Sequence, residues 1–97
     1  MNDQRVLEFV TKLCQRHGAT RIVLFGSRAR GNCHELSDYD IAIFGINDSK
    51  TKLVIREECE ESAPTLKKID VVFTHEASPE LLQYIESEGI ILYERKT

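Results

Sequence analysis

The sequence predicts a small α/β (α+β) protein in which helices pack on a mixed β-sheet. The chain has 97 residues, of which 41% are hydrophobic and 30% charged, and this is the ordinary composition of one globular domain covering residues 1–97. Four short apolar runs alternate with segments whose apolar residues have helical spacing. Short strands separated by helices are typical of a sheet that is covered by helices.

Four elements are expected in the first half of the chain. Asn2 or Asp3 can cap a helix that ends near His17, because its apolar residues form one stripe. Glycines or polar residues then bound two strands, and a short helical turn and a polar loop lie between them. Only about a dozen residues join these strands, so an antiparallel pair fits as well as a crossover. The expected strands, turn and loop are Arg21–Phe25, Tyr39–Phe44, Ser27–Arg30 and Asn32–Ser37.

The second half is expected to add two helices and two strands. Ser49 is the expected cap of a helix over residues 50–62, which Pro64 terminates. Ser78 and Pro79 form a typical helix start. The expected strands on either side of that last helix are Lys68–Phe73 and Ile90–Tyr93.

Charge and composition exclude several classes of protein. The net charge of −3 disfavours non-specific binding to nucleic acid. No apolar run approaches the ~20 residues of a membrane span, and the N-terminus lacks a signal-peptide layout. Three cysteines without a CxxC motif are typical of a reduced cytoplasmic protein. Cys33 and His34 have no second pair of ligands nearby, so a zinc site is not expected.

Three aspartates interrupt the apolar strands. Asp38 and Asp40 stand at the start of the second strand and point to one face, whereas Tyr39 points to the other, into a core. Asp70 lies inside the third strand. If these strands are neighbours, the three carboxylates converge and repel one another, and a divalent cation such as Mg²⁺ would remove the repulsion. The alternative is a turn cap at Asp38 and a solubilising edge charge at Asp70.

The segment from Phe25 to Gly31 suits phosphate binding. A strand that ends in Gly26-Ser27 and leads into a helical turn exposes backbone N–H groups and a hydroxyl. The segment is not a P-loop, because residues 32 and 33 are not the required Lys and Ser or Thr. Arg28 and Arg30 could supply positive charge to a triphosphate, or they could belong to a solvated basic loop.

Together these features resemble the minimal nucleotidyltransferases of the DNA polymerase β superfamily. The matching features are Gly26-Ser27, then ten residues, then Asp38-Tyr39-Asp40 in an apolar strand, and Asp70 in another. The resemblance covers essentially the whole chain and implies the palm-like nucleotidyltransferase fold. The extra helical domain of larger superfamily members is absent from this sequence.

The resemblance implies a role for each motif residue. Gly26 and Ser27 would hold the β- and γ-phosphates of ATP. Asp38 and Asp40 would coordinate two Mg²⁺ ions, and Asp70 would complete the ion nearer the nucleophile. Two such ions can polarise the α-phosphate and stabilise the leaving pyrophosphate.

The resemblance also implies a partner. Such proteins are often antitoxins paired with a helical HEPN-type toxin encoded nearby, and they can attach AMP to a tyrosine of that toxin. We therefore expect AMP transfer from ATP to a hydroxyl of a HEPN partner, in a homo- or hetero-oligomer. Two alternatives are a binding module without turnover and a transferase that modifies a small molecule with a helical companion subunit.

Overall fold

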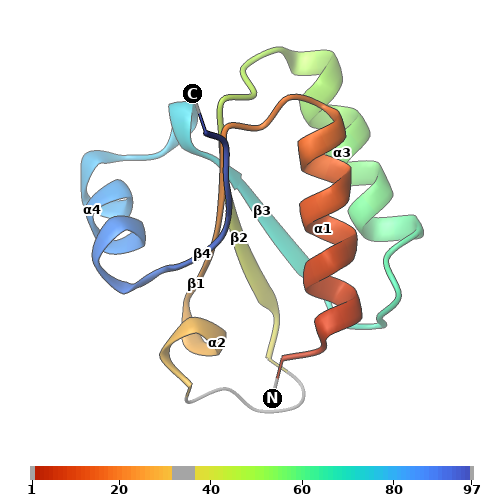
Figure 1. Cartoon of the computed structure of the whole chain (residues 1–97), viewed down its shortest axis with the longest axis horizontal. Helices are drawn as coiled ribbons and strands as arrows, with labels where there is room; N and C mark the ends of the chain where they lie inside the picture. Colours follow the sequence, from red (N-terminus) through yellow and green to blue (C-terminus); the bar gives the residue numbers. More distant parts are fainter. Residues whose placement is uncertain (1, 32–36, 97) are drawn as a thin grey trace.

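Four short strands form one mixed sheet in the computed structural model, which describes residues 2–31 and 37–96 (Figure 1). The order across the sheet is β3-β2-β1-β4. Strand β1 is antiparallel to both β2 and β4, whereas β2 and β3 are parallel. The predicted mixed sheet is therefore confirmed, and the first two strands form the antiparallel pair. The strands are β1 (Arg21–Phe25), β2 (Tyr39–Phe44), β3 (Ile69–Phe73) and β4 (Ile90–Glu94).

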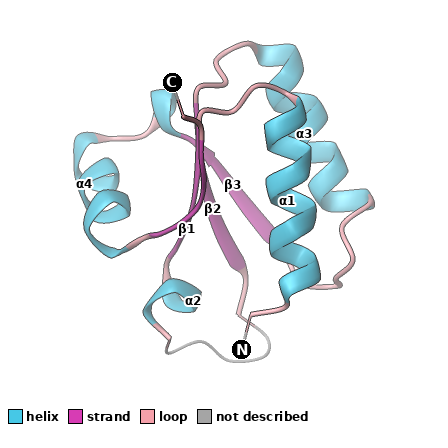
Figure 2. Cartoon of the chain, viewed as in Figure 1, coloured by secondary structure: helices cyan, strands magenta, loops and turns pink. Residues whose placement is uncertain are grey.

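Helices cover both faces of this sheet. Helices α1 (Gln4–Arg16) and α3 (Ser49–Glu61) lie on one face, and α4 (Pro79–Glu88) lies on the other (Figure 2). Helix α3 is the crossover that the parallel β2–β3 pair requires. The short α2 (Ser27–Arg30) follows β1 directly, and a 3₁₀ turn, η1 (Thr74–Glu76), follows β3.

The central strands β1 and β2 send alternate side chains into the two layers. Ile22, Leu24 and Ile41 belong to the core beneath α1 and α3, and Val23 and Ala42 pack with α4 on the other face. Tyr39 has 1% of its surface exposed and lies in the α1/α3 core, as the alternation predicts. The neighbouring even-numbered positions of β2 therefore face the α4 layer.

Several element boundaries differ by one residue from the sequence prediction, among them the end of β4, which lies at Glu94. Helix α3 begins at Ser49, and its cap is Asp48, whose Oδ2 accepts hydrogen bonds from the N–H of Thr51 at 2.9 Å and from its Oγ1 at 2.8 Å. Two consecutive residues can each serve as a cap, and the carboxylate reaches the third residue of the helix. The third strand begins at Ile69, one residue later than predicted.

The first helix begins as expected. Asp3 is its cap, with Oδ1 accepting the Arg5 N–H at 2.9 Å. Most of the expected loop 32–37, with the Cys33–His34 pair, lies outside the described residues. Among the described residues, no helix is long and apolar enough to cross a membrane.

Two cysteines belong to the core between α1 and α3. Cys14 and Cys59 are buried free thiols. Burial raises the pKa of Cys14 to about 12 and that of Cys59 to about 11. Both groups are therefore protonated at neutral pH and pack as small apolar side chains.

Candidate functional site

Asp40 and Asp70 lie side by side on neighbouring strands. The parallel ladder of β2 and β3 pairs Asp40 with Asp70, and the antiparallel ladder pairs Asp40 with Phe25 at the end of β1. Paired residues of adjacent strands project from the same face of a sheet. Asp38, two residues before Asp40, comes just before the start of β2. The fold therefore sets Asp40 beside Asp70, and Asp38 lies two residues before Asp40 along the chain.

Asp40 lies in surroundings that disfavour its negative charge. Burial is the main cause that raises the pKa of Asp40, and the negative charges of Asp70 and then Asp38 raise it further. The positive charge of Lys68 acts in the opposite direction. A carboxylate in such surroundings favours a bound proton or a bound cation.

Lys68 is a member of this cluster that the sequence analysis missed. Its Nζ lies 3.2 Å from Oδ1 of Asp70, and the hydrogen bond to Asp70 is the main cause that raises the pKa of Lys68. The signal was present in the sequence, because Lys68 stands two residues before Asp70 in an extended segment and so shares its side of the strand.

Gly26 brings the predicted phosphate loop into contact with Asp40. Its φ of +78° favours glycine, and a Cβ at this position would lie 2.4 Å from Oδ2 of Asp40. The Gly26 carbonyl accepts the N–H groups of Ala29 and Arg30 at 3.1 and 3.2 Å, which makes the turn that places Ser27 at the start of α2. The absence of a side chain at Gly26 is thus what lets the loop and the carboxylate meet.

The two arginines of α2 occupy different environments. Arg28 is 3% exposed, and its guanidinium binds the carbonyl of Ser37 and stacks on the ring of Tyr39. Arg30 instead extends along the surface to the hydroxyl of Tyr84 on α4. Arg30 is therefore accessible to a ligand. Arg28 is buried, which is not the position expected of a side chain that contacts phosphate, as the sequence predicts.

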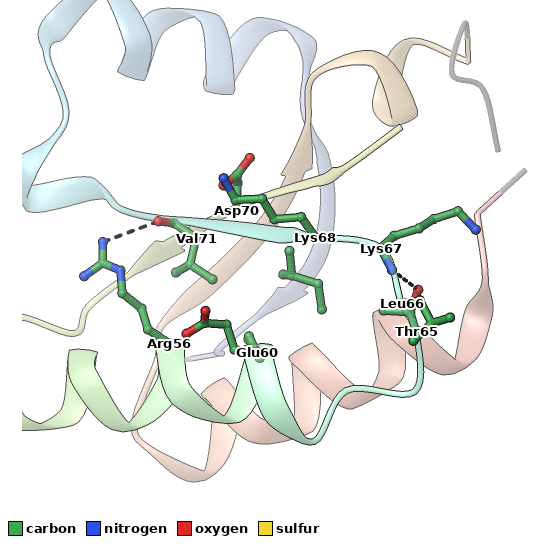
Figure 3. Close-up of a pocket in the computed structure, with 10 residues that line it drawn as sticks. Arg56, Glu60, Thr65, Leu66, Lys67, Lys68, Asp70 and Val71 are labelled. Atoms are coloured by element: carbon green, nitrogen blue, oxygen red, sulfur yellow. Dashed lines mark hydrogen bonds and ion pairs between the residues drawn. The ribbon is translucent and has the colours of Figure 1, made fainter. Parts of the chain in front are cut away.

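A groove of about 490 Å³ runs along the open edge of β3 (Figure 3). Asp70 and Lys68 extend from one side of the strand, and Arg56 and Glu60 of α3 lie on the other. Arg56 donates to the carbonyl of Val71 at 3.5 Å. The groove therefore begins beside a candidate catalytic carboxylate. Its lining residues are Arg56, Cys59, Glu60, Thr65, Leu66, Lys67, Lys68, Ile69, Asp70 and Val71.

The carboxylates of the site can be compared with the ligands that a divalent cation needs. Within residues 2–31 and 37–96, no three His, Cys, Asp or Glu side chains form a ready set of ligands. Mg²⁺ commonly takes only one or two carboxylates and completes its shell with water and substrate phosphates. The carboxylates of Asp40 and Asp70, adjacent in the β2–β3 ladder, meet that requirement.

A glycine-serine loop lies against one of two paired carboxylates on a four-stranded mixed sheet. This combination is typical of the class of nucleotidyltransferases. Residues 8–97 match the family model described as "Polymerase beta, Nucleotidyltransferase". The chain belongs to this family, and it is a nucleotidyltransferase. The family resemblance predicted from the motifs is thereby confirmed.

Solved structures share this fold. A protein assigned as a minimal nucleotidyltransferase is 30% identical with a TM-score of 0.71, over 87% of this chain and 86% of that one. A toxin–antitoxin with AMP-PNP is 24% identical with a TM-score of 0.77, over 93% of this chain and 74% of that one.

A third structure is that of the tri-AMPylated Shewanella oneidensis HEPN toxin in complex with MNT antitoxin. The match is 22% identical with a TM-score of 0.71, over 95% of this chain and 72% of that one. No curated protein matches the sequence significantly.

Proposed function

We propose that this nucleotidyltransferase moves AMP from ATP to a protein hydroxyl, namely a tyrosine of a HEPN-type helical partner encoded nearby. The observation that carries the proposal is the contact between the two halves of the site. Gly26 of the phosphate loop lies against the carboxylate of Asp40, which is in register with Asp70. A triphosphate on the loop would therefore present its α-phosphate to the carboxylates.

The chain's own residues would bind and orient the substrate. The loop at Gly26 and Ser27 would hold the β- and γ-phosphates, and the exposed Arg30 can approach the same anion. The acceptor oxygen would attack the α-phosphorus, and the bond from that phosphorus to the oxygen bridging to the β-phosphate would break. Pyrophosphate leaves, and the proton of the hydroxyl passes to Asp70 or to water. Phosphoryl transfer of this kind depends mainly on positioning and charge neutralisation.

Asp38, Asp40 and Asp70 would hold Mg²⁺. When bound, two such ions would neutralise the triphosphate and lower the pKa of the attacking hydroxyl. Lys68, which pairs with Asp70, would add a positive charge beside the bound phosphates.

The choice of a protein acceptor rests on three observations. The groove along β3 begins at Asp70, which leaves room for a polypeptide on the side where the nucleophile must arrive. One structure that shares the fold contains an AMPylated HEPN toxin bound to an MNT antitoxin. The net charge of −3 also disfavours a nucleic-acid acceptor.

The direct test is transfer of label from α-³²P-ATP. The purified chain is mixed with MgCl₂, the nucleotide and the HEPN protein encoded beside it, and the labelled residue is identified by mass spectrometry. Label is expected on a tyrosine of the partner. D38N and D40N are expected to reduce transfer by roughly 100-fold or more, because a metal contributes several kcal/mol of charge stabilisation.

A matched control is D48N, which makes the same chemical change at the cap of α3 and should leave transfer unchanged. Transfer that survives both D38N and D40N would contradict the metal assignment. Retained partner binding without transfer from any nucleotide would favour a binding module. Labelling of a small molecule in place of the partner would overturn the choice of acceptor.

A further inference from the structure

Arg28 is one of only two buried charged side chains in the described part of the chain, the other being Lys52. Nε and Nη2 of its guanidinium both donate to the carbonyl oxygen of Ser37, at 3.0 and 2.8 Å. Nη1 donates to Oδ1 of Asn2 at 3.2 Å, and Nδ2 of Asn2 donates back to the Arg28 carbonyl at 3.4 Å.

The ring of Tyr39 covers one side of this guanidinium. The Cζ atom of Arg28 lies 3.9 Å from the ring centroid, within the range of a cation–π contact. The hydroxyl of Tyr39 in turn accepts the backbone N–H of Asp3 at 2.9 Å. Arg28 and Tyr39 thus tie the start of α1 to the start of β2.

These contacts flank Asp38. Ser37 comes immediately before Asp38, and Tyr39 comes immediately after it. Arg28 itself follows Ser27 of the phosphate loop. The Arg28 side chain therefore joins the phosphate loop to both neighbours of Asp38, through the Ser37 carbonyl and the Tyr39 ring. Asp40, two residues after Asp38, lies against Gly26.

Burial of a guanidinium is energetically costly unless its donors are satisfied. Here every side-chain nitrogen of Arg28 has an acceptor in the protein. Because only 3% of its surface is exposed, Arg28 offers little surface for a phosphate to contact. The planar fork of arginine suits the Ser37 carbonyl and the Tyr39 ring together, which lysine cannot reproduce.

We infer that Arg28 is a positioning residue that holds Asp38 and Asp40 in their metal-binding arrangement, and that it does not bind the triphosphate. The inference rests on the proposed function, which supplies the assumption that these aspartates bind a divalent cation. Residues that orient metal ligands typically change metal affinity 10- to 100-fold when they are replaced.

The test uses the full chain with R28K and Mn²⁺ as a spectroscopic probe. Free Mn²⁺ is measured by electron paramagnetic resonance in the absence of nucleotide. R28K is expected to weaken Mn²⁺ binding by roughly 10-fold or more and to speed hydrogen exchange at the amides of residues 38–40. N2A, which removes one partner and keeps Arg28, is expected to act in the same direction with a smaller change.

The matched control is K52M, which removes the other buried cation. Lys52 pairs with Glu76 and contacts His75, and both of these residues lie in η1, which follows β3. K52M should therefore lower stability. It should leave Mn²⁺ affinity within about twofold of the wild type, because Lys52 is distant from the aspartates. This control separates a general loss of stability from a loss of ligand positioning.

Two results would overturn the inference. One is wild-type Mn²⁺ affinity in R28K with a raised KM for ATP, which would make Arg28 a phosphate ligand. The other is hydrogen exchange at residues 38–40 that is no faster in R28K than in K52M. If the wild-type chain bound no Mn²⁺, the metal assignment of the proposed function would fail, and the exchange measurement would still decide the role of Arg28.

Discussion

At the scale of single residues, Gly26 is the position where a substitution would disturb both the backbone conformation and a carboxylate of the site. G26A would impose a side chain on a φ of +78° and place Cβ 2.4 Å from Oδ2 of Asp40. We expect a loss of about 1–3 kcal/mol in the free energy of unfolding and a loss of nucleotidyl transfer, because Asp40 must move. Urea unfolding and the label-transfer assay measure the two effects.

The matched control for G26A is G18A. Gly18 also has a positive φ, of +94°, but a Cβ there meets nothing within 4 Å. G18A should therefore lower stability through backbone strain alone and leave transfer intact. Equal loss of transfer in both variants would show that strain, and not the contact with Asp40, explains the effect.

A second prediction at this scale concerns the charge of Asp40. Its pKa in the folded chain is raised, first by burial and then by Asp70 and Asp38, so the ionised form opposes folding at neutral pH. D40N should raise Tm in EDTA at pH 7. The advantage should shrink as pH falls from the raised pKa towards the ordinary value of 3.8, where wild-type Asp40 becomes protonated in both states.

Scanning calorimetry at several pH values tests this prediction. A D40N protein that is less stable than the wild type at pH 7 in EDTA would contradict it. The same variant should not show any rise in Tm on addition of Mg²⁺. D40N is therefore expected to be more stable than the wild type in EDTA and to gain less stability than the wild type from Mg²⁺.

At the scale of elements, the cap of α3 makes a separate prediction. D48A removes the acceptor of the Thr51 N–H and should lower Tm by roughly 4–8 °C, as expected when a domain of this size loses a helix cap. S49A is the control and should change stability by less than ~0.5 kcal/mol. The opposite ranking would restore Ser49 as the cap.

The same cap gives a pH dependence of opposite sign to that of Asp40. The hydrogen bond from the backbone of Thr51 is the main cause that lowers the pKa of Asp48. Its contribution to stability is therefore present above the ordinary value of 3.8 and lost as pH falls through the lowered pKa. The difference between wild type and D48A should disappear in that acidic range.

Local patterns were sufficient to predict most elements. The runs Arg21–Phe25 and Tyr39–Phe44 are strands with the predicted bounds, because short β-rich runs next to glycines or polar residues specify them locally. The cap of α3 was predicted at Ser49 and lies at Asp48, since adjacent polar residues give the same local signal. The 3₁₀ turn Thr74–Glu76 has no distinct pattern and was missed.

The site was predicted only in part, because some of its contacts join distant segments. Alternation was enough to place Asp40 on the face opposite the buried Tyr39, whereas Asp38 precedes β2 and its predicted place on the same side stays a prediction. The register that sets Asp40 beside Asp70 depends on strand order, which no local pattern specifies. Burial of Arg28 against Tyr39 and Asn2 is likewise a tertiary result, so the sequence could offer only its charge.

At the scale of the whole molecule, nucleotide binding should couple to stability. ATP with Mg²⁺ at 100 times its Kd is expected to raise the free energy of unfolding by about 2.7 kcal/mol, provided that the unfolded chain does not bind it. Thermal unfolding across a series of ATP concentrations measures this. D40N is expected to show little of the rise, and an equal rise in D40N would show that the nucleotide binds elsewhere.

The parallel pairing of β2 with β3 also makes metal binding at the site depend on the register between these two strands. Side chains alternate with a period of two, so a slip of β3 by one residue would turn Asp70 away from Asp40 and bring Ile69 or Val71 into its place. The same slip would expose core side chains and abolish the carboxylate pair. Insertions or deletions in the connection at residues 62–68 can therefore be screened by metal titration alone, because a misaligned chain that is still compact would lose its affinity.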